Sequence, residues 1–366
     1  MLRAMMLLNM CVSYDMRMWE KFEAMELPPE AFIEDAPVVW EKLEITERNR
    51  TIMGKALASN WVERELDACG RHGIRIVTCR DAEYPHSLAK TGKAPILLYI
   101  KGNMLPEEAR TIAVVGTRRC SSYGYKVARE IGRRAANAGW NVVSGGAKGI
   151  DGAAHFGCAE DGGLTAAVLG TGADVVYPPE HKALFERIIE RGVIYSEYPL
   201  GAKGEPWHFP KRNRIIAGLA SKIIVVEAPA KSGAMITATH AAEEGREVWA
   251  VPGRIDDARS EGTNRLIFDG AMPLVNLESF FESKSGYAEQ SLFNDDNELC
   301  AKPEPRNPSP EEKKIMSILS IHGEKTIDNL ANEAKMSAAE VFKIISLMSA
   351  KGLVFLSGPG RYSAND

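Results

Sequence analysis

Basic side chains recur in short glycine-containing turns in the middle of this sequence. Arg118 and Arg119 follow one such turn, Lys148 lies in a second, and a third basic cluster spans 211–214. Glycine lets a backbone turn sharply and approach a ligand closely. A turn that opens onto a helix also presents free N–H groups and the positive end of the helix dipole, which favour anions. The pattern therefore predicts a phosphate-binding surface.

Short, nearly all-apolar runs precede these turns and are typical of strands buried on both faces. The predicted strands are 74–78, 111–116, 141–144, 165–169, 193–196, 222–227 and 247–251. The predicted helices between them are 61–71, 123–138, 151–160, 180–190, 212–220 and 234–244. This alternation predicts a doubly wound, mostly parallel, Rossmann-like α/β sheet. Ligands of such sheets lie beyond the carboxyl ends of the strands, so the basic turns are expected to meet along one edge.

The 366 residues carry a formal net charge of −4, so a polyanion could be bound only by local clusters of Lys and Arg. Six cysteines include no C-x-x-C pair, which favours reduced thiols in a cytoplasmic protein and no metal site. The apolar stretch 4–12 is interpreted as an amphipathic first helix rather than a signal peptide. No apolar run is long enough to span a bilayer, so no membrane association is expected.

Four regions are predicted along the chain. Residues 1–60 show helical periodicity and form a small helical domain of SAM or helix-hairpin-helix type, followed by the Rossmann-like domain at 61–282. The stretch 283–308 is rich in Glu, Ser, Asn, Asp and Pro and is predicted to be a disordered linker. Three helical patterns and a two-strand pattern at 309–366 predict a winged helix-turn-helix domain.

Some individual side chains in the central region can also be interpreted as having only a structural role. Asp151 is interpreted as a helix N-cap rather than a catalytic acid, and His155 and His240 as packing residues. Trp207 and Phe209 lie beside the third basic cluster and could stack on bases. The chain lacks G-x-x-x-x-G-K-[ST], and 116–124 lacks G-x-G-x-x-G, so neither ATP nor a dinucleotide cofactor is expected.

Several of these segments, taken together, resemble the DprA/Smf family of DNA-processing proteins. The resemblance covers about 70–275. It rests on these segments in family order: Tyr84-Pro85, 95–102, Gly116-Thr117-Arg118 with Ser121 and Tyr123-Gly124, 144–151 with His155, 177–179, 196–199, Phe209-Pro210, 212–219, 226–228, Ser232-Gly233 and 251–253.

The resemblance implies a protein that binds single-stranded DNA without sequence preference, uses no cofactor, and is not an enzyme. It implies a homodimer formed through the Rossmann-like domain, and transfer of the strand to the RecA recombinase during natural transformation or recombination. Family contacts carry over onto Arg118, Lys148, Phe209 and Arg212, while Arg119, Lys211 and Arg214 are added from charge placement, with Arg214 alternatively packing inward. The expected DNA-binding residues are Gly116, Thr117, Arg118, Arg119, Ser121, Gly146, Lys148, Phe209, Lys211, Arg212 and Asn213.

An enzyme is the main alternative, because the same sheet resembles, more distantly, nucleotide phosphoribohydrolases of the lysine-decarboxylase-like group. That group carries a Pro-Gly-Gly-x-Gly-Thr loop, whereas 229–234 here reads Pro-Ala-Lys-Ser-Gly-Ala. Glu197 and Glu227 remain possible acids. A second alternative is a sequence-specific repressor acting through the C-terminal domain. Its expected recognition helix, 337–351, lacks Asn, Gln and Arg, so base-edge readout would be poor.

Overall fold

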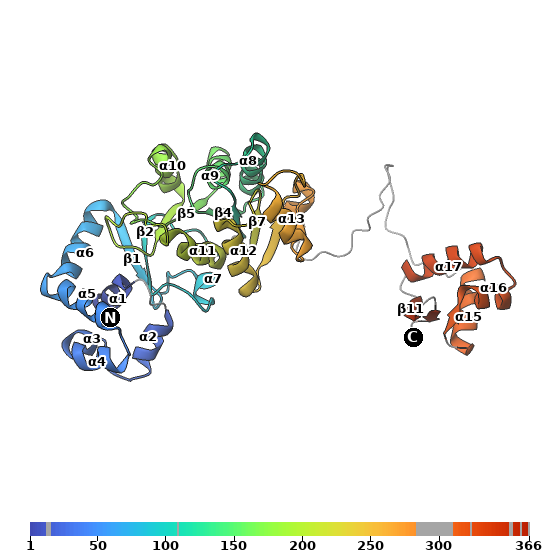
Figure 1. Cartoon of the computed structure of the whole chain (residues 1–366), viewed down its shortest axis with the longest axis horizontal. Coiled ribbons are helices and arrows are strands. Elements are labelled where there is room, and N and C mark those ends of the chain that lie inside the picture. The colour runs from blue at the N-terminus through green and yellow to red at the C-terminus, as the bar shows by residue number, and fades with distance from the viewer. Residues whose placement is uncertain are drawn as a thin grey trace. The chain divides into compact units, whose positions relative to one another are not determined.

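The structure is a computed structural model that describes residues 1–11, 16–107, 110–282, 310–322, 324–350, 354–358 and 361–364. The chain divides into two compact units, 1–287 and 288–366 (Figure 1). The segment 283–308, predicted to be a disordered linker, lies outside the described residues.

A nine-stranded sheet forms the centre of the first unit, in the order β1-β2-β6-β5-β4-β3-β7-β8-β9. Strands β3 to β9 pair in parallel, and β2 joins β6 and β1 in antiparallel fashion. The mostly parallel sheet predicted from the apolar runs is therefore confirmed. Its strands are β1 (Ile74–Thr78), β2 (Leu97–Gly102), β3 (Thr111–Val115), β4 (Asn141–Ser144), β5 (Thr165–Leu169), β6 (Val193–Ser196), β7 (Lys222–Val225), β8 (Glu247–Ala250) and β9 (Met272–Pro273).

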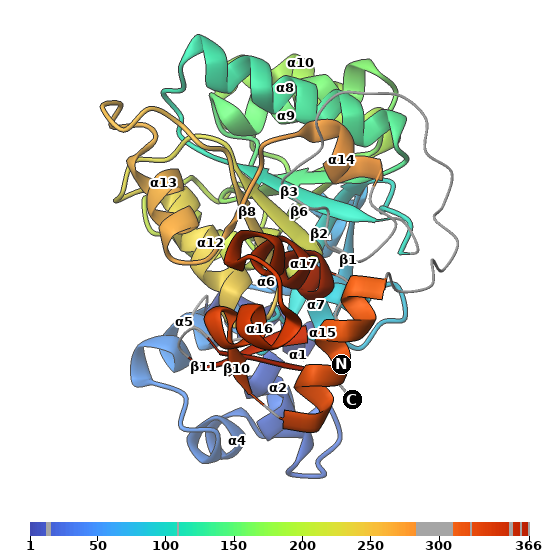
Figure 2. The ribbon, with the colours of Figure 1, turned by 90° about the vertical axis from the view of Figure 1, so that its right-hand side faces the viewer.

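Helices cover both faces of this sheet, as the apolar strands require. Ile112 and Val114 of β3 pack with α8 and α9, whereas Ala113 and Val115 belong to the core that includes α11 and α12 (Figure 2). The helices that follow β1 are α7 (His86–Ala89), α8 (Ser122–Asn137), α9 (Ile150–Glu160), the 3-10 turn η1 (Pro179–His181), α10 (Lys182–Arg191), α11 (His208–Leu219), α12 (Gly233–Glu243), α13 (Glu261–Phe268) and α14 (Leu277–Glu282).

The start of α11 differs from the prediction. The helix begins at His208, four residues before the expected start at Arg212, so that Phe209 and Lys211 lie in its first turn rather than in a loop. Pro210 is compatible with this, because the N–H groups of a first helical turn have no partner within the helix.

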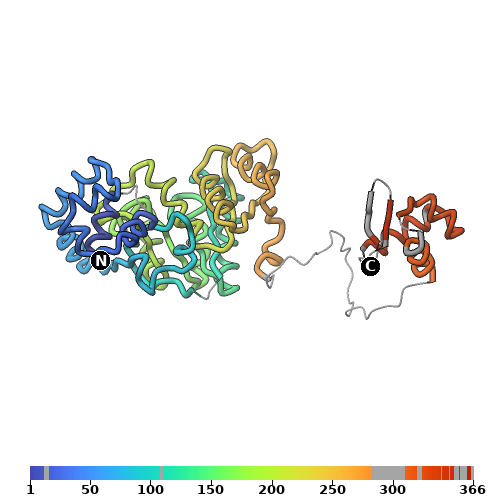
Figure 3. Tube along the Cα trace, turned by 90° about the horizontal axis from the view of Figure 1, so that it is seen from below, coloured from blue at the N-terminus to red at the C-terminus, as the bar shows by residue number. Residues whose placement is uncertain are grey.

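The N-terminal helices pack directly against the sheet. They are α1 (Leu2–Met10), α2 (Met16–Glu23), α3 (Ala31–Glu34), α4 (Ala36–Lys42), α5 (Glu47–Ala58) and α6 (Trp61–His72), and Figure 3 shows them at the opposite end of the unit from 250–282. The expectation of an amphipathic first helix is wrong, because Ala4 through Asn9 are all buried. Six consecutive buried residues cover every side of a helix, so this part of α1 lies inside the core. The one polar residue among them, Asn9, donates a hydrogen bond to the Glu197 carbonyl at 2.8 Å.

The second unit has its own small core, which includes Ile315, Leu330, Val341 and Ile345. Its helices are α15 (Pro310–His322), α16 (Ile327–Ala334) and α17 (Ala338–Ala350), and its strands, in sheet order, are β10 (Lys325–Thr326), β12 (Arg361–Ala364) and β11 (Val354–Gly358). The winged-helix assignment stays a prediction. In the part of the chain that the structure describes, no helix is both long and apolar enough to cross a bilayer.

Candidate functional site

A cavity of about 610 Å³ opens where the order of the parallel strands reverses direction. From β3 the chain proceeds through β4, β5 and β6 on one side, and β7 lies on the other side of β3. The cavity is lined by Val115 at the end of β3, by 116–119 after it, and by Pro229 and 231–234 after β7. We call it the switch-point cavity, because open α/β sheets bind their ligands at such reversals.

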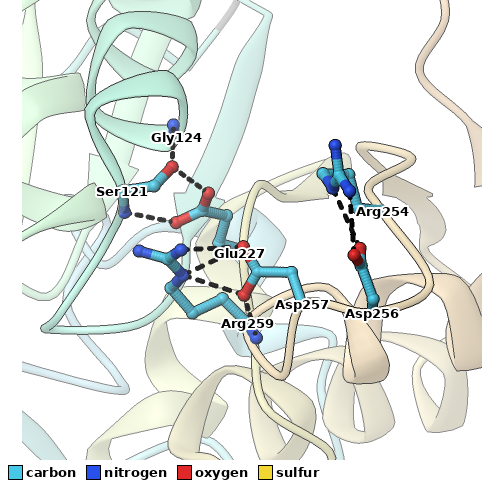
Figure 4. A network of polar contacts seen from close by, with 7 residues as sticks. All are labelled: Ser121, Gly124, Glu227, Arg254, Asp256, Asp257 and Arg259. Carbon is cyan, nitrogen blue, oxygen red and sulfur yellow. Dashed lines mark hydrogen bonds and ion pairs between the residues drawn. The ribbon is translucent and has the colours of Figure 1, made fainter.

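The first turn is held in place by the carboxylate of Glu227, which follows β7 (Figure 4). That carboxylate accepts hydrogen bonds from the backbone N–H of Ser121 at 2.8 Å and from the Ser121 hydroxyl. Ser121 in turn caps α8, because its hydroxyl oxygen accepts from the Gly124 N–H at 2.9 Å. Thr117 donates its N–H to the Glu227 carbonyl at 2.7 Å. The turn is thus fixed while its two arginines remain exposed.

On the opposite side of the same network, Arg259 pairs with Asp257 and Arg254 pairs with Asp256, both at 2.8 Å (Figure 4). The backbone of this segment also meets the loop after β7, since Ala228 donates its N–H to the Arg259 carbonyl at 2.7 Å. These cations are occupied by neighbouring acids. Each of these two arginines thus has an acidic partner two residues away.

A stack of three side chains forms one wall of the cavity. The Arg118 guanidinium lies over the Phe209 ring, 4.9 Å from its centroid, and the Tyr177 ring lies 5.4 Å from Phe209. All three also line a small adjoining pocket of about 70 Å³, together with Lys148 and Arg212. The structure therefore brings Arg118, Lys148 and Arg212 together from three separate segments, as the sequence predicted.

The second turn presents Lys148 to solvent, where its ammonium pairs with Glu180 at 2.7 Å. Gly146 has a φ of +66°, a conformation that glycine adopts without strain. Its carbonyl accepts a hydrogen bond from His181 at 3.0 Å. The first two turns also touch, because Ile150 donates its N–H to the Thr117 carbonyl at 3.3 Å.

Arg212 lines the cavity, although its side chain is almost entirely buried. Its guanidinium donates to the carbonyls of Gly145, at 2.8 Å, and of Val168. Burial lowers the pKa of Arg212, and the charge of the buried Asp151 opposes that shift. Burial likewise raises the pKa of Asp151 against the attraction of Arg212. The two hydrogen bonds of Arg212 join the second turn to the end of β5, so this buried side chain helps to position the turn.

Asp151 itself is not the N-cap that the sequence suggested. Gly149 occupies the N-cap position of α9, and Asp151 lies inside the first turn of the helix. One Asp151 oxygen accepts a hydrogen bond from the Gly145 N–H at 3.2 Å. A Cβ at Gly145 would lie 2.7 Å from that oxygen, so the close approach requires glycine there.

The remaining predicted residues are less exposed to the cavity. Asn213 is buried and joins α11 to α12 through a hydrogen bond to the Gly233 carbonyl at 2.9 Å. Arg214 packs inward, where it pairs with Glu197 and donates to the Lys93 carbonyl. Lys211 lies 3.9 Å from the same Glu197 carboxylate. Neither Lys211 nor Arg214 lines the switch-point cavity.

Sequence reasoning left three residues of the site unassigned. Tyr177, with 41% of its surface exposed, packs beside Phe209. Lys231 and Ser232 line the cavity just before α12. The rule that ligands lie at strand ends would have found Lys231, because it follows β7 at the same edge as Arg118.

Both acids that could have served an enzyme are occupied by structural contacts. Glu227 holds the first turn, and Glu197 is buried against Arg214. Among the residues described, no group of three or more His, Cys, Asp or Glu side chains is placed to hold a metal ion. His155, expected to be a packing residue, is fully buried beside Thr165.

The fold and the site define an open α/β protein with a basic crevice at its strand-order reversal. The chain belongs to the DNA recombination-mediator protein A (DprA/Smf) family, whose sequence model matches residues 75–285. It is 42% identical over 213 residues to protein Smf of Synechocystis sp., an alignment that covers 57% of this chain and 54% of that relative.

Two solved structures share this fold. The X-ray structure of DprA from Streptococcus pneumoniae superposes with a TM-score of 0.61 at 35% identity, covering 68% of this chain and 86% of that one. A structure of DprA from Helicobacter pylori, described as giving insight into its single-stranded DNA binding mode, has a TM-score of 0.52 at 27% identity. That match covers 57% of this chain and 94% of the other.

Proposed function

We propose that the chain binds single-stranded DNA without sequence preference, along the edge that carries the switch-point cavity. The observation that carries this proposal is the meeting of Arg118 and Lys148, both exposed, beside the aromatic side chains of Phe209 and Tyr177. Cations hold phosphates, and exposed aromatic faces stack on bases of any identity. The Helicobacter pylori relative, whose structure concerns single-stranded DNA binding, supports the same substrate class.

Binding rather than catalysis is the function that this geometry favours. Arg118 offers a charge for phosphates, whereas Glu197 and Glu227 are engaged in holding neighbouring segments. The proposal contains no base-edge contact, so the affinity should depend on strand length and salt rather than on sequence. No feature of the described residues specifically favours the phosphoribohydrolase alternative. Incubation with nucleoside monophosphates, followed by assay for a released base, tests it directly.

The test is fluorescence anisotropy of the full-length protein with single-stranded and duplex oligonucleotides of several sequences. We expect tighter binding of single strands and similar affinity across sequences. Arg118→Ala should weaken binding of every single strand, and each lost phosphate contact should flatten the log–log salt dependence by about 0.7. Lys55→Ala is the matched control, since Lys55 is an exposed cation on α5 away from the cavity. Unchanged affinity and salt slope in Arg118→Ala and Lys148→Ala would refute the proposal.

The wider role that we propose is delivery of the strand to the RecA recombinase in the cytoplasm, by a homodimer formed through the Rossmann-like domain. Family membership supports this part. Sedimentation of the full-length protein should give twice the chain mass. RecA filament formation on strands already covered by a single-strand-binding protein should become faster when the full-length protein is added, and an unchanged rate would exclude delivery.

A further inference from the structure

The switch-point cavity carries more positive charge than the residues around it neutralise. Arg118, Arg119 and Lys231 line it, and none of the three forms an ion pair within the described part of the chain. Other cations near the same edge are neutralised, as Lys148 is by Glu180 and Arg214 by Glu197. Three cations without an ion pair therefore lie around this one cavity.

Carboxylates are scarce among the side chains that line this cavity. Among the described residues that line it, Asp151 is the single carboxylate, and its charge is directed at the Gly145 N–H and at Arg212. The cavity therefore offers an anion three cations and little opposing charge. A cavity of about 610 Å³ also lies within the range that small ligands occupy in proteins.

Helix α12 begins at the cavity with its N-terminal groups uncapped by a side chain. The N-cap residue is Ser232, which makes no capping hydrogen bond, and its hydroxyl is buried without a hydrogen-bond partner. The helix runs for 11 residues, so its dipole adds to the local positive potential. An anion beside Lys231 would receive the Ser232 hydroxyl and the first N–H groups of the helix as donors.

We propose that the switch-point cavity binds a terminal phosphate monoester, carried by the end of a DNA strand or by a free nucleoside monophosphate. The inference rests on the proposed binding of single-stranded DNA along this edge. A monoester carries about −1.5 to −2 charges at pH 7, whereas each internal diester carries one. Three cations and a helix N-terminus complement the more highly charged group. Pro210 and Pro229, both half-buried, provide apolar surface for the attached sugar and base.

The experiment compares oligothymidines of about 15 nucleotides, labelled internally, that carry a 5′ phosphate, a 3′ phosphate or hydroxyls at both ends. Anisotropy with the full-length protein should show about five- to twentyfold tighter binding for one phosphorylated end than for the hydroxyl ends. The preference should shrink below about pH 6, where the monoester loses its second charge. Thymidine monophosphate should compete better than thymidine, which would show that the free nucleotide also occupies the cavity.

Variants are judged by the ratio between the two affinities, because this ratio cancels a general loss of binding. Lys231→Ala should bring the ratio close to one, and the matched control Lys55→Ala should leave it unchanged. A ratio of one in the unmodified protein overturns the inference, as does an equal loss of both affinities in Lys231→Ala.

Failure of the proposed function would look different, because no oligonucleotide would bind at all. Calorimetric titration with thymidine monophosphate then decides the matter. Binding that requires both the phosphate and Lys231 supports the cavity as a phosphate site, and no binding overturns it.

Discussion

Lys148 is exposed at the edge of the adjoining pocket, where its ammonium pairs with Glu180. This hydrogen bond lowers the pKa of Glu180, so the carboxylate is charged at neutral pH and competes with any phosphate for Lys148. The acid thus reduces the positive potential that a DNA strand would meet.

Replacement of Glu180 by glutamine should therefore strengthen the binding of single-stranded DNA. We expect a gain of about two- to fivefold at low salt that disappears at high salt, since exposed charges are screened. Anisotropy titrations at two salt concentrations measure it. Glu41→Gln, which removes an exposed acid from α4, is the control and should leave the affinity unchanged. Weaker binding by Glu180→Gln would show that Glu180 positions Lys148 for DNA.

His155 lies beneath the site as a neutral side chain. The Thr165 hydroxyl donates to the Val142 carbonyl at 2.8 Å, so its oxygen accepts from His155 Nδ1, 2.7 Å away. The other ring nitrogen is buried without a partner, and burial lowers the pKa of His155 to about 3. Protonation of His155 therefore takes place in the unfolded state first.

Stability should consequently fall as the pH drops from about 6.5 towards 3, because the unfolded state then binds the proton that the folded state excludes. At pH 5 the loss attributable to His155 is ~2 kcal/mol relative to neutral pH. Urea denaturation at pH 5 and at neutral pH measures the free energy of unfolding of the unmodified protein and of His155→Gln. The loss between the two pH values should be ~2 kcal/mol larger in the unmodified protein. Parallel pH dependences in the two proteins would contradict the assignment.

At the scale of elements, the buried side chains of Asp151 and Arg212 connect three of them through hydrogen bonds to backbone groups. Asp151 belongs to α9, Arg212 to α11, and the guanidinium bonds to the carbonyl of Val168 in β5. The second turn, with Lys148 in it, is held between α9 and the end of β4 by the same contacts. The position of Lys148, which we propose to contact phosphates, thus depends on two side chains that are almost entirely buried.

Removal of one of these two buried charges should therefore lower the free energy of unfolding more than removal of a surface charge does. Asp151→Ala removes the acceptor of the buried Gly145 N–H and the nearby charge that favours the buried Arg212, and we expect a loss of about 1–3 kcal/mol in the free energy of unfolding. Asp67→Ala, an exposed change on α6, should stay within about 0.5 kcal/mol. Chemical denaturation measures both. A small loss in Asp151→Ala would mean that water enters and solvates the guanidinium.

Seven of the nine strands of the sheet were predictable because each is a short apolar run that ends near a turn, whereas β2 and β9 were not predicted as strands. The start of α11 was not predictable either, since Pro210 and two aromatic residues resemble a loop when the burial of the helix is unknown. Arg212 and Arg118 look alike in the sequence, yet one is buried and the other exposed. Which face of a helix points inward depends on the partners it packs against, and the local sequence does not contain them.

At the scale of the whole molecule, the N-terminal helices and the sheet share one apolar core. Met5, Leu7 and Trp19 belong to the same cluster as strand residues such as Leu97 and Val168. The sequence pattern identified the helices but gave no sign that α1 packs in the interior. The described residues of the second unit form a core cluster of their own.

Truncation at residue 282 and truncation at residue 61 should have different effects on folding. A chain of residues 1–282 keeps both core clusters of the first unit and should remain folded, with single-strand affinity within about threefold of the full-length protein. A chain beginning at residue 61 exposes the apolar surface that α1 and α2 cover, and it should be insoluble or unfold without cooperativity. Circular dichroism during thermal unfolding and anisotropy with single strands measure both. Residues 309–366 alone should not bind duplex DNA, because α17 (Ala338–Ala350) contains no Asn, Gln or Arg for base edges. Duplex binding by that fragment would revive the repressor alternative, and cooperative folding of 61–366 would show that the N-terminal helices form an independent domain.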